Sequence, residues 1–355
     1  MGKKSDKHMT IRDIARIAGT SVTTVSRVLN DVNYPVSNEL KKRVREAAEA
    51  ANYVPNPMAR SLKGSNNTFT DIGIVIPNIS NQFYLQTTLG INNIAFDKGY
   101  NLILCNTMRR VEKEREYLRL LYERQVRGVI LSSIDSDSSI VCDYITKGMK
   151  FVLLDQRIEN SNCSCINFDS RKGAGMAVDY LISQGHHRIA FATTPLTRWT
   201  RKEVFIGYKD ALKNANIEYT EELLYVSGRE FDNDDSNYEI NSGDILAKQF
   251  IENPHDATAV LCINDMVAFG FIRTLNKNGI RVPDDISVVG FDDIPFADTF
   301  LPPLTTIRYP SNETGKLAAM MLFSNLSDDR ENLTLDMNLE PKLIIRETVK
   351  SLNQS

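Results

Sequence analysis

The stretch Thr10-Ile-Arg-Asp-Ile-Ala-Arg-Ile-Ala-Gly-Thr-Ser-Val-Thr-Thr-Val-Ser-Arg-Val-Leu-Asn30 decides the fold of the N-terminal part of the chain. Its first residue stands three positions before an acid, which is a capping-box start of a helix, and apolar residues then recur at helical spacing. Gly19 can adopt the left-handed conformation that ends this helix. After two intervening residues, a second apolar pattern begins at Val22. Two short helices around a glycine-containing turn predict a helix-turn-helix.

The second helix of this pair is the predicted DNA-reading element. Ser21 is its expected N-cap, and one face carries short or forked hydrogen-bonding side chains that suit base edges and phosphates in a major groove. A third helix, capped by Ser37, has an apolar packing stripe from Leu40 to Ala51. A unit this small has no room for a pocket, so binding is its expected role. Its candidate DNA-contacting residues are Thr10, Ser21, Val22, Thr23, Thr24, Ser26, Arg27 and Asn30.

A short helical segment follows, Asn56-Pro-Met-Ala-Arg-Ser-Leu-Lys-Gly64. Asparagine as N-cap, proline at the first helical position and glycine at the end favour a helix, but barely two turns should be unstable alone in water. We therefore expect a hinge helix that folds on contact with DNA and a partner copy; an ordered linker helix is the alternative. Its candidate DNA contacts are Asn56, Met58, Ala59, Leu62 and Lys63.

Charge is distributed unevenly along the chain. Residues 1–64 hold 12 basic and 6 acidic side chains, whereas the rest of the chain holds 30 basic and 39 acidic ones, and the formal net charge is −3. A positive head on a negative body lets DNA phosphates attract one end of the molecule only. The charge pattern therefore agrees with the DNA-binding role predicted for the head.

From Asp71 onward, short apolar runs alternate with helical stretches. Near-continuous apolar strands between helices predict parallel, doubly wound sheets covered on both faces. The runs are too numerous for one sheet, so we expect two α/β lobes that divide near residues 165–170. The fold class is thus an all-α helix-turn-helix head followed by a two-lobed α/β body. The runs include residues 72–76, 102–105, 128–131, 151–154, 188–191, 259–262 and 286–289.

Residues 10–64 resemble the lactose-repressor/galactose-repressor family of transcriptional regulators, and several motifs of the body resemble its sensor domain. Among these motifs are Asn78-Ile-Ser-Asn-Gln-Phe-Tyr84, Ile263-Asn-Asp-Met-Val-Ala268 and Gly290-Phe-Asp-Asp293. The resemblance implies a sequence-specific repressor that binds a palindromic operator as a homodimer. It also implies that Val22, Thr23 and Arg27 read bases. The hinge helix would pair with its dimer mate in the minor groove, with Leu62 as the apolar wedge.

The resemblance also sets the expected domain boundaries. The head would span residues 1–55, the hinge helix 56–64 and the body 70–350. The body would be similar to periplasmic sugar-binding proteins, with three chain crossings between the lobes and the ligand in the cleft. The first lobe would comprise about 70–167 and 303–328, and the second about 168–302 and 329–350.

Polar residues that follow the predicted strands are the candidate effector ligands, because ligands of open α/β sheets bind beyond the carboxyl ends of the strands. Carboxylates and amides beside aromatic rings suit a sugar or sugar derivative, whose hydroxyls need paired acceptors while its C–H face stacks. The family matches favour two of these residues in particular, Asn264 and Asp292. The full set is Phe83, Tyr84, Ser132, Asp155, Arg198, Trp199, Arg201, Asn264 and Asp292.

One position departs from the family pattern. Many sensors of the family have arginine three residues before the glycine that matches Gly207, and Val204 stands there in this chain. Our hypothesis is that one of Arg198, Arg201 and Lys202 replaces the missing arginine and that the adjacent tryptophan lines the cleft. The cationic cluster points to an acidic or phosphorylated sugar; a solvated loop is the alternative reading.

The chain lacks the motifs of the main enzyme classes. No GxGxxG follows a predicted strand, and P-loop, GxSxG and HExxH motifs are absent. His186-His187 precedes a strand and reads as structural, and the Cys163-x-Cys165 pair is a weak metal signal. We expect no enzyme, no cofactor and no metal, and the cysteine pattern favours a reduced cytoplasm.

The sequence also disfavours two further classes of protein. No apolar stretch approaches the roughly 20 residues that a membrane span needs, and the N-terminus has no apolar signal region, which disfavours membrane contact and a secreted transport-binding protein. A protein co-regulator that docks on the body in place of a small effector stays open. So does the sign of control, because an effector could either release DNA or promote its binding.

The hinge helix generates the first prediction. Replacing Leu62 with alanine removes the apolar wedge but keeps the charge of the head, so the change should weaken operator binding far more than non-specific DNA binding. Fluorescence anisotropy with an operator duplex and with an unrelated duplex at the same salt concentration measures both. Equal losses on the two duplexes would contradict the wedge role.

Overall fold

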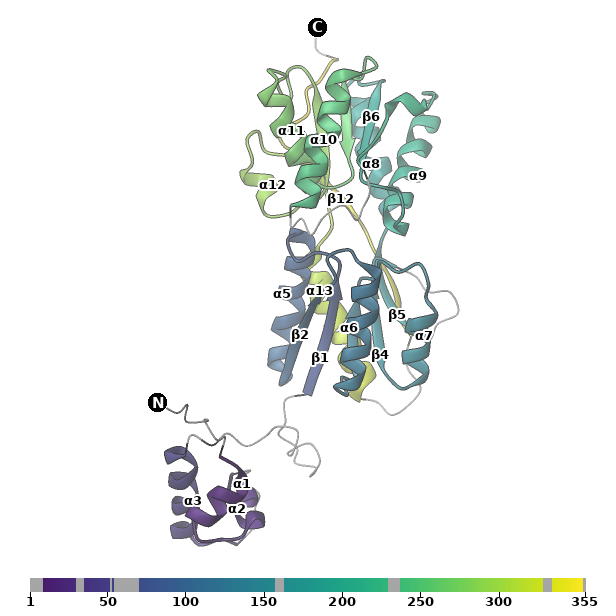
Figure 1. The fold of residues 1–355 in the computed structure, drawn as a ribbon. Coiled ribbons are helices and arrows are strands. Elements are labelled where there is room, and N and C mark those ends of the chain that lie inside the picture. Colours follow the sequence, from purple (N-terminus) through teal and green to yellow (C-terminus); the bar gives the residue numbers. More distant parts are fainter. Residues whose placement is uncertain are drawn as a thin grey trace. The chain divides into compact units, whose positions relative to one another are not determined.

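The computed structural model describes residues 9–29, 35–51, 53, 70–156, 163–228, 237–327 and 334–353. The chain divides into two compact units, Met1–Phe69 and Thr70–Ser355. Figure 1 shows the first as a helical unit in purple and the second as an α/β unit in blue to yellow. No helix in the described ranges is both long and apolar enough to cross a membrane.

The first unit contains the predicted helix-turn-helix. Its described helices are α1 (Ile11–Ile17), α2 (Val22–Leu29) and α3 (Asn38–Ala50). The capping box that opens α1 is present: the Asp13 amide donates to the Thr10 hydroxyl and the Asp13 carboxylate accepts from the Thr10 amide. Gly19, with φ of 60°, ends the first helix in the left-handed region, as its position predicts. Apolar side chains of all three helices form a common core.

The second unit begins with a six-stranded, all-parallel sheet in the order β11-β5-β4-β3-β1-β2. Its strands are β1 (Thr70–Ile76), β2 (Tyr100–Asn106), β3 (Gly128–Leu131), β4 (Lys150–Leu154), β5 (Ser164–Phe168) and β11 (Asp336–Leu339). Alternate residues of the strands enter two separate apolar clusters on opposite faces of the sheet. Burial on both faces explains the near-continuous apolar runs. The helices of this lobe are α5 (Gln82–Asp97), α6 (Val111–Glu123), α7 (Ser139–Thr146) and α13 (Ser311–Ser327).

The second lobe is built on another six-stranded sheet, in the order β12-β10-β9-β8-β6-β7. The sheet is parallel except for its edge strand β12, which runs antiparallel to β10 and departs from the predicted parallel pattern. Its strands are β6 (Ile189–Thr193), β7 (Leu224–Val226), β8 (Ala259–Cys262), β9 (Ser287–Asp292), β10 (Thr305–Arg308) and β12 (Lys342–Ile344). Its helices are α8 (Ser170–Ser183), α9 (Trp199–Asn214), α10 (Tyr238–Glu252), α11 (Asp265–Lys277) and α12 (Phe296–Thr299), with a 3₁₀ turn at Glu221–Leu223.

The chain passes between the lobes three times, after β5, β10 and β11. The first passage falls within the predicted interval at residues 165–170. The boundaries predicted for the other two were wrong. Strand β10 pairs with β9 and so belongs to the second lobe, which moves the second passage from residue 302 to the residues after Arg308. Strand β11 pairs with β5 and so belongs to the first lobe, which moves the third passage from residue 328 to the residues after Leu339.

Candidate functional site

The exposed side of α2 presents the residues predicted to read DNA. Val25 and Val28 are buried in the core of the head, whereas Val22 is 38% exposed at the start of the helix and Thr23 is exposed beside it. A solvent-facing valine and threonine at a helix N-terminus can offer methyl contacts and a hydroxyl to base edges. Arg27, in the last turn, is half-buried and has an interaction partner.

Two of the predicted DNA contacts already cap helices. The Thr10 hydroxyl donates to Asp13 over 2.7 Å, and the Ser21 hydroxyl accepts from the Thr24 amide over 3.1 Å. Both caps can place backbone N–H groups toward a phosphate, so a role at the DNA backbone stays a prediction for them. Asn30 and the hinge helix at 56–64, with Asn56, Met58, Ala59, Leu62 and Lys63, lie outside the described residues.

A cleft that is partly open to solvent lies between the two lobes of the body. Its walls come from the carboxyl ends of strands in both sheets and from the helices that follow them, as expected for open α/β sheets. Of the predicted effector ligands, those on its walls are Phe83, Tyr84, Asp155, Arg198, Arg201, Asn264 and Asp292.

Two predicted effector ligands do not line this cleft. Ser132 is fully buried behind Tyr84, and its hydroxyl lies 3.4 Å from the hydroxyl of that tyrosine. Trp199 lines a neighbouring cavity with Asn167 and Glu203, so the prediction that it lines the effector cleft is corrected. At about 100° per residue, the first residues of α9 point in different directions, so that Arg201 faces the cleft while Trp199 faces the neighbouring cavity.

Arg198 bridges the lobes. It is the N-cap residue of α9 in the second lobe, and its guanidinium donates to the Tyr84 hydroxyl over 2.8 Å and to the Ser132 hydroxyl over 3.3 Å in the first lobe. Arg201, also on the cleft wall, donates to the Pro195 carbonyl over 2.9 Å. Val204, at the position of the family arginine, lies on the same wall and is buried. Guanidinium groups are therefore present in the cleft although the family position holds valine.

Two cleft carboxylates sit on strained backbone at the carboxyl ends of strands β4 and β9. Asp155 has φ of 54° and Asp292 has φ of 108°, a region that non-glycine residues enter at a cost of about 1 kcal/mol or more. Burial raises the pKa of Asp155 to about 6, against an opposing effect of the Arg198 guanidinium. Burial raises the pKa of Asp292 well above its usual value, and the nearby acids Asp265 and Asp155 add to the effect. Strain and desolvation together make these two carboxylates the candidates for binding a ligand.

The sequence reasoning missed several residues of the cleft. Arg109 lines it from a left-handed backbone conformation that it shares with Met108, and its guanidinium lies 4.1 Å from the ring centre of Tyr238 in the other lobe. Glu239 also lines it and accepts a 3.1 Å hydrogen bond from Asn78 across the lobes. Tyr309 reaches it from the second chain crossing. Nothing in the local sequence of Glu239 marks it as a ligand.

A helix-turn-helix unit joined to a two-lobed α/β unit with a polar cleft between its lobes defines a DNA-binding regulator with a ligand-sensing domain. The comparisons agree with this class. Residues 10–56 match the model of bacterial regulatory proteins of the lacI family, and residues 178–349 match a periplasmic binding protein-like domain. The chain belongs to the lacI family and is a DNA-binding transcriptional repressor rather than an enzyme.

Individual relatives cover almost the whole chain. It is 37% identical over 347 residues to the HTH-type transcriptional repressor PurR of Vibrio atlanticus, which covers 97% of this chain and 99% of that protein. The structure of the lac repressor dimer bound to operator and the anti-inducer ONPF is 26% identical, covers 97% of this chain and all of that one, and has a TM-score of 0.78. A lacI-family regulator of Enterococcus faecium with bound ribose is 27% identical, covers 80% of this chain and all of that one, and has a TM-score of 0.71.

The raised pKa of Asp155 generates a stability prediction. Since the folded-state pKa of about 6 exceeds the ordinary value of 3.8, the folded state binds the proton more tightly than the unfolded state. The stability contributed by this group is full below about pH 4 and is lost as the pH rises through 6. We expect Asp155→Asn to raise the free energy of unfolding of the ligand-free protein by ~1–2 kcal/mol at about pH 7.5 and to change it little at about pH 4. Urea unfolding at both pH values measures this.

The matched control is Asp285→Asn. Hydrogen bonds from Arg281 lower the pKa of Asp285 to about 2, so its loss should reduce stability at about pH 7.5, with the opposite sign. A gain for Asp155→Asn that is equal at both pH values would be inconsistent with a burial effect on the carboxylate.

Proposed function

We propose that this repressor binds an operator of approximate two-fold symmetry as a homodimer, under the control of a neutral, polyhydroxylated effector bound in the inter-lobe cleft. The observation that carries the proposal is the pair of strained, desolvated carboxylates, Asp155 and Asp292, at the carboxyl ends of two strands in a cleft with aromatic walls. Buried carboxylates that accept hydroxyl hydrogens recover part of their lost hydration, so a ligand with several hydroxyl donors gains most from this site.

The charges in the cleft support a neutral ligand. Asp155, Glu239 and Asp292 line it, and these three acids are balanced by three guanidinium groups. Arg198 donates to the Tyr84 hydroxyl, so at least one of its N–H groups is already used and would have to be released to bind an anion. A phosphorylated sugar would bring two more negative charges near three carboxylates. We therefore favour a neutral sugar, or a neutral molecule that carries one, over the acidic ligand that the arginine cluster suggests.

Aromatic side chains supply the second part of sugar recognition. Phe83 and Tyr84 from the first lobe, Phe291 from the second and Tyr309 from the crossing line the cleft. Aromatic faces stack on the C–H faces of sugar rings while acceptors bind the hydroxyls. Relatives support this class, since solved family members have been described with bound ribose and in complex with cellobiose.

The homodimer is supported by the outer surface of the first lobe. Helices α5 and α13 pack side by side, and Leu89, Phe96 and Met320 on them are 44%, 73% and 52% exposed. Exposed large apolar side chains on neighbouring helices are typical of a protein interface. The related lac repressor has been solved as a dimer on its operator. An isologous dimer would present two heads to two half-sites of an operator in the cytoplasm.

The proposed control works through the angle between the lobes. An effector among Asp155, Asp292 and Arg198 contacts both lobes, so its binding favours one lobe arrangement over another. In a dimer, that arrangement would set the distance between the two hinge segments at 56–64. A hinge helix of two turns is stable only when paired, so a change of distance would decide whether the heads stay on DNA.

The effector proposal is tested by isothermal titration calorimetry of the full chain with ribose, cellobiose and glucose, and with ribose 5-phosphate and glucose 6-phosphate. We expect binding of at least one neutral sugar and weaker or no binding of its phosphate. Asp292→Asn should weaken the sugar by about tenfold or more, because a carboxylate acceptor is lost. Asp284→Asn, an exposed acid outside the cleft, is the matched control.

Other outcomes of the titration separate the alternatives. Binding of phosphorylated sugars alone would contradict the neutral ligand. If no small molecule of the panel binds while a protein from the cell retains the body and alters operator affinity, the co-regulator alternative replaces the effector.

Selection of bound duplexes from a random pool tests the DNA side. We expect two half-sites related by a two-fold axis. Arg27→Ala should relax base preference at one position in each half-site, since an arginine–guanine pair contributes about 1–3 kcal/mol of discrimination. Lys42→Ala, on the outer side of α3 beside Glu46, is the control that should leave base preference unchanged. A selected site without symmetry would overturn the dimeric mode of binding.

A further inference from the structure

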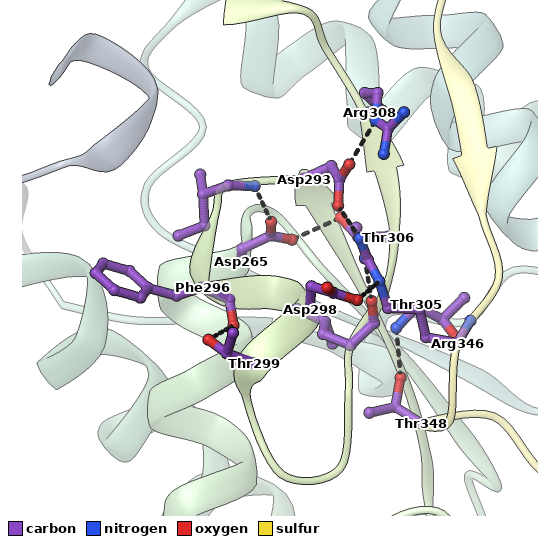
Figure 2. A network of polar contacts seen from close by, with 12 residues as sticks. Asp265, Asp293, Phe296, Asp298, Thr299, Thr305, Thr306, Arg308, Arg346 and Thr348 are labelled. Carbon is purple, nitrogen blue, oxygen red and sulfur yellow. Dashed lines mark hydrogen bonds and ion pairs between the residues drawn. The ribbon is translucent and has the colours of Figure 1, made fainter. Parts of the chain in front are cut away.

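The buried carboxyl group of Asp265 lies directly behind the effector cleft. Asp265 is the first residue of α11 and is fully buried, and it does not line the cleft, although its neighbour Asn264 does. Both of its oxygens are engaged: one accepts from the Ile294 backbone N–H over 2.9 Å and the other from the Thr306 hydroxyl over 2.6 Å. Figure 2 shows this carboxyl group between the turn after β9 and strand β10.

The turn that Asp265 binds is strained. Asp292 and Asp293 both have positive φ, 108° and 54°, which two successive aspartates rarely adopt. Such a conformation persists only where the surroundings hold it in place. The Ile294 N–H bond to Asp265 holds the end of the turn, and its beginning is held by the Asp292 carbonyl, which accepts from the Tyr309 N–H over 3.2 Å.

Asp293 fixes the same turn from the other side. Its carboxylate, buried with a side-chain exposure of 5%, accepts from Arg308 over 2.5 Å and from Arg346 over 2.7 Å (Figure 2). Arg308 is the last residue of β10, immediately before the chain crosses to the first lobe. The turn that carries Asp292 is thus bonded to the crossing segment through the backbone of Tyr309 and through Arg308.

The strand opposite Asp265 leaves room for the carboxyl group. A Cβ atom at Gly290 would lie 2.3 Å from Asp265 Oδ1, so glycine is required there as long as the carboxyl group keeps its place. This contact links two sequence motifs, Asn264-Asp265 and Gly290-Phe-Asp-Asp293, that are far apart along the chain. Among the described residues no cation contacts the Asp265 carboxyl group, so its burial costs desolvation free energy that no direct ion pair offsets. Its two hydrogen bonds offset part of that cost.

We propose that Asp265 is the positioning residue for Asp292: from behind the cleft it fixes the strained 292–294 turn, so that the effector-binding carboxylate and the second chain crossing move as one unit. Asp265 does not touch the effector. The inference rests on the proposed function of the cleft, since Asp292 matters here as the residue that binds the effector. It predicts that Asp265 and Thr306 affect effector affinity although neither residue lines the cleft.

The test measures backbone amide exchange by mass spectrometry in the ligand-free full chain, on a peptide that covers residues 291–297. Thr306→Val keeps the side-chain shape and removes one bond to Asp265, and we expect it to speed exchange in this peptide by about tenfold. Thr305→Val is the matched control: Thr305 is equally buried in the same strand, but its hydroxyl accepts from the Arg346 N–H and does not contact Asp265. This control variant should leave the exchange rate of the peptide unchanged.

Asp265→Asn is the conservative rescue. Its amide oxygen can accept from Ile294 and its amide N–H can donate to Thr306, so exchange should stay within about threefold of the wild type. Asp265→Ala should speed exchange more than Thr306→Val. The proposal is overturned if Thr305→Val and Thr306→Val speed exchange equally, if Asp265→Asn behaves like Asp265→Ala, or if exchange rises to the same extent throughout β8 and β9. If Asp265→Ala does not fold, the comparison of Thr306→Val with Thr305→Val still tests whether the bond to Asp265 holds the turn.

A second readout concerns affinity. Ribose and cellobiose are titrated into the same variants, and Thr306→Val should weaken whichever sugar binds the wild type by about tenfold while Thr305→Val leaves its affinity unchanged. If the wild type binds neither sugar, the neutral-sugar form of the proposed function fails, and the exchange measurement still decides the role of Asp265.

Discussion

The three chain crossings between the lobes pack against one another, so the lobes can move relative to each other only if the crossings change conformation. The ring of Phe168, at the first crossing, stacks on Tyr309 of the second with ring centres 4.3 Å apart. The backbone N–H of Asp169 donates to the carbonyl of Leu339, at the third crossing, over 3.2 Å. Close-packed elements exchange between discrete arrangements rather than deform continuously. The crossings therefore convert a ligand contact at the cleft into a choice between a few lobe positions.

The fold holds two carboxyl groups of the cleft in surroundings that destabilise their ionised form. Asp155 and Asp292 lie on strained backbone, and burial raises the pKa of both. The Arg198 guanidinium offsets part of this effect at Asp155. The remainder of the protein has to stabilise the arrangement, and the network of Asp265 and Asp293 behind it does so with hydrogen bonds and two arginine pairs. If these carboxylates bind the effector, as proposed, binding affinity and protein stability oppose each other at the same two residues.

How well each part of the structure could be predicted from the sequence depends on how far apart along the chain the interacting residues lie. The helix-turn-helix was predictable because caps, the left-handed Gly19 and apolar spacing act within a few residues. Strand existence was predictable because burial on both faces leaves continuous apolar runs. The sheet to which β11 belongs was not, because this strand pairs with β5 about 170 residues earlier in the chain, Asp336 opposite Cys165. Strand ends revealed Asp155 and Asp292, but Glu239 enters the cleft only because the lobes meet, and no local pattern records that.

Arg198 links recognition to lobe position, because the same guanidinium lines the cleft and binds the opposite lobe. Its bonds to Tyr84 and Ser132 already hold the lobes together without a ligand. An effector that accepts from Arg198 in place of Tyr84 removes a cross-lobe bond, and it favours separation unless it binds the first lobe itself. An effector that fills the space beside the bond and engages Asp155 and Asp292 adds cross-lobe contacts and favours closure. Under the proposed function, the sign of control would be a competition for one guanidinium, and it would depend on where the acceptors of the effector lie relative to Tyr84.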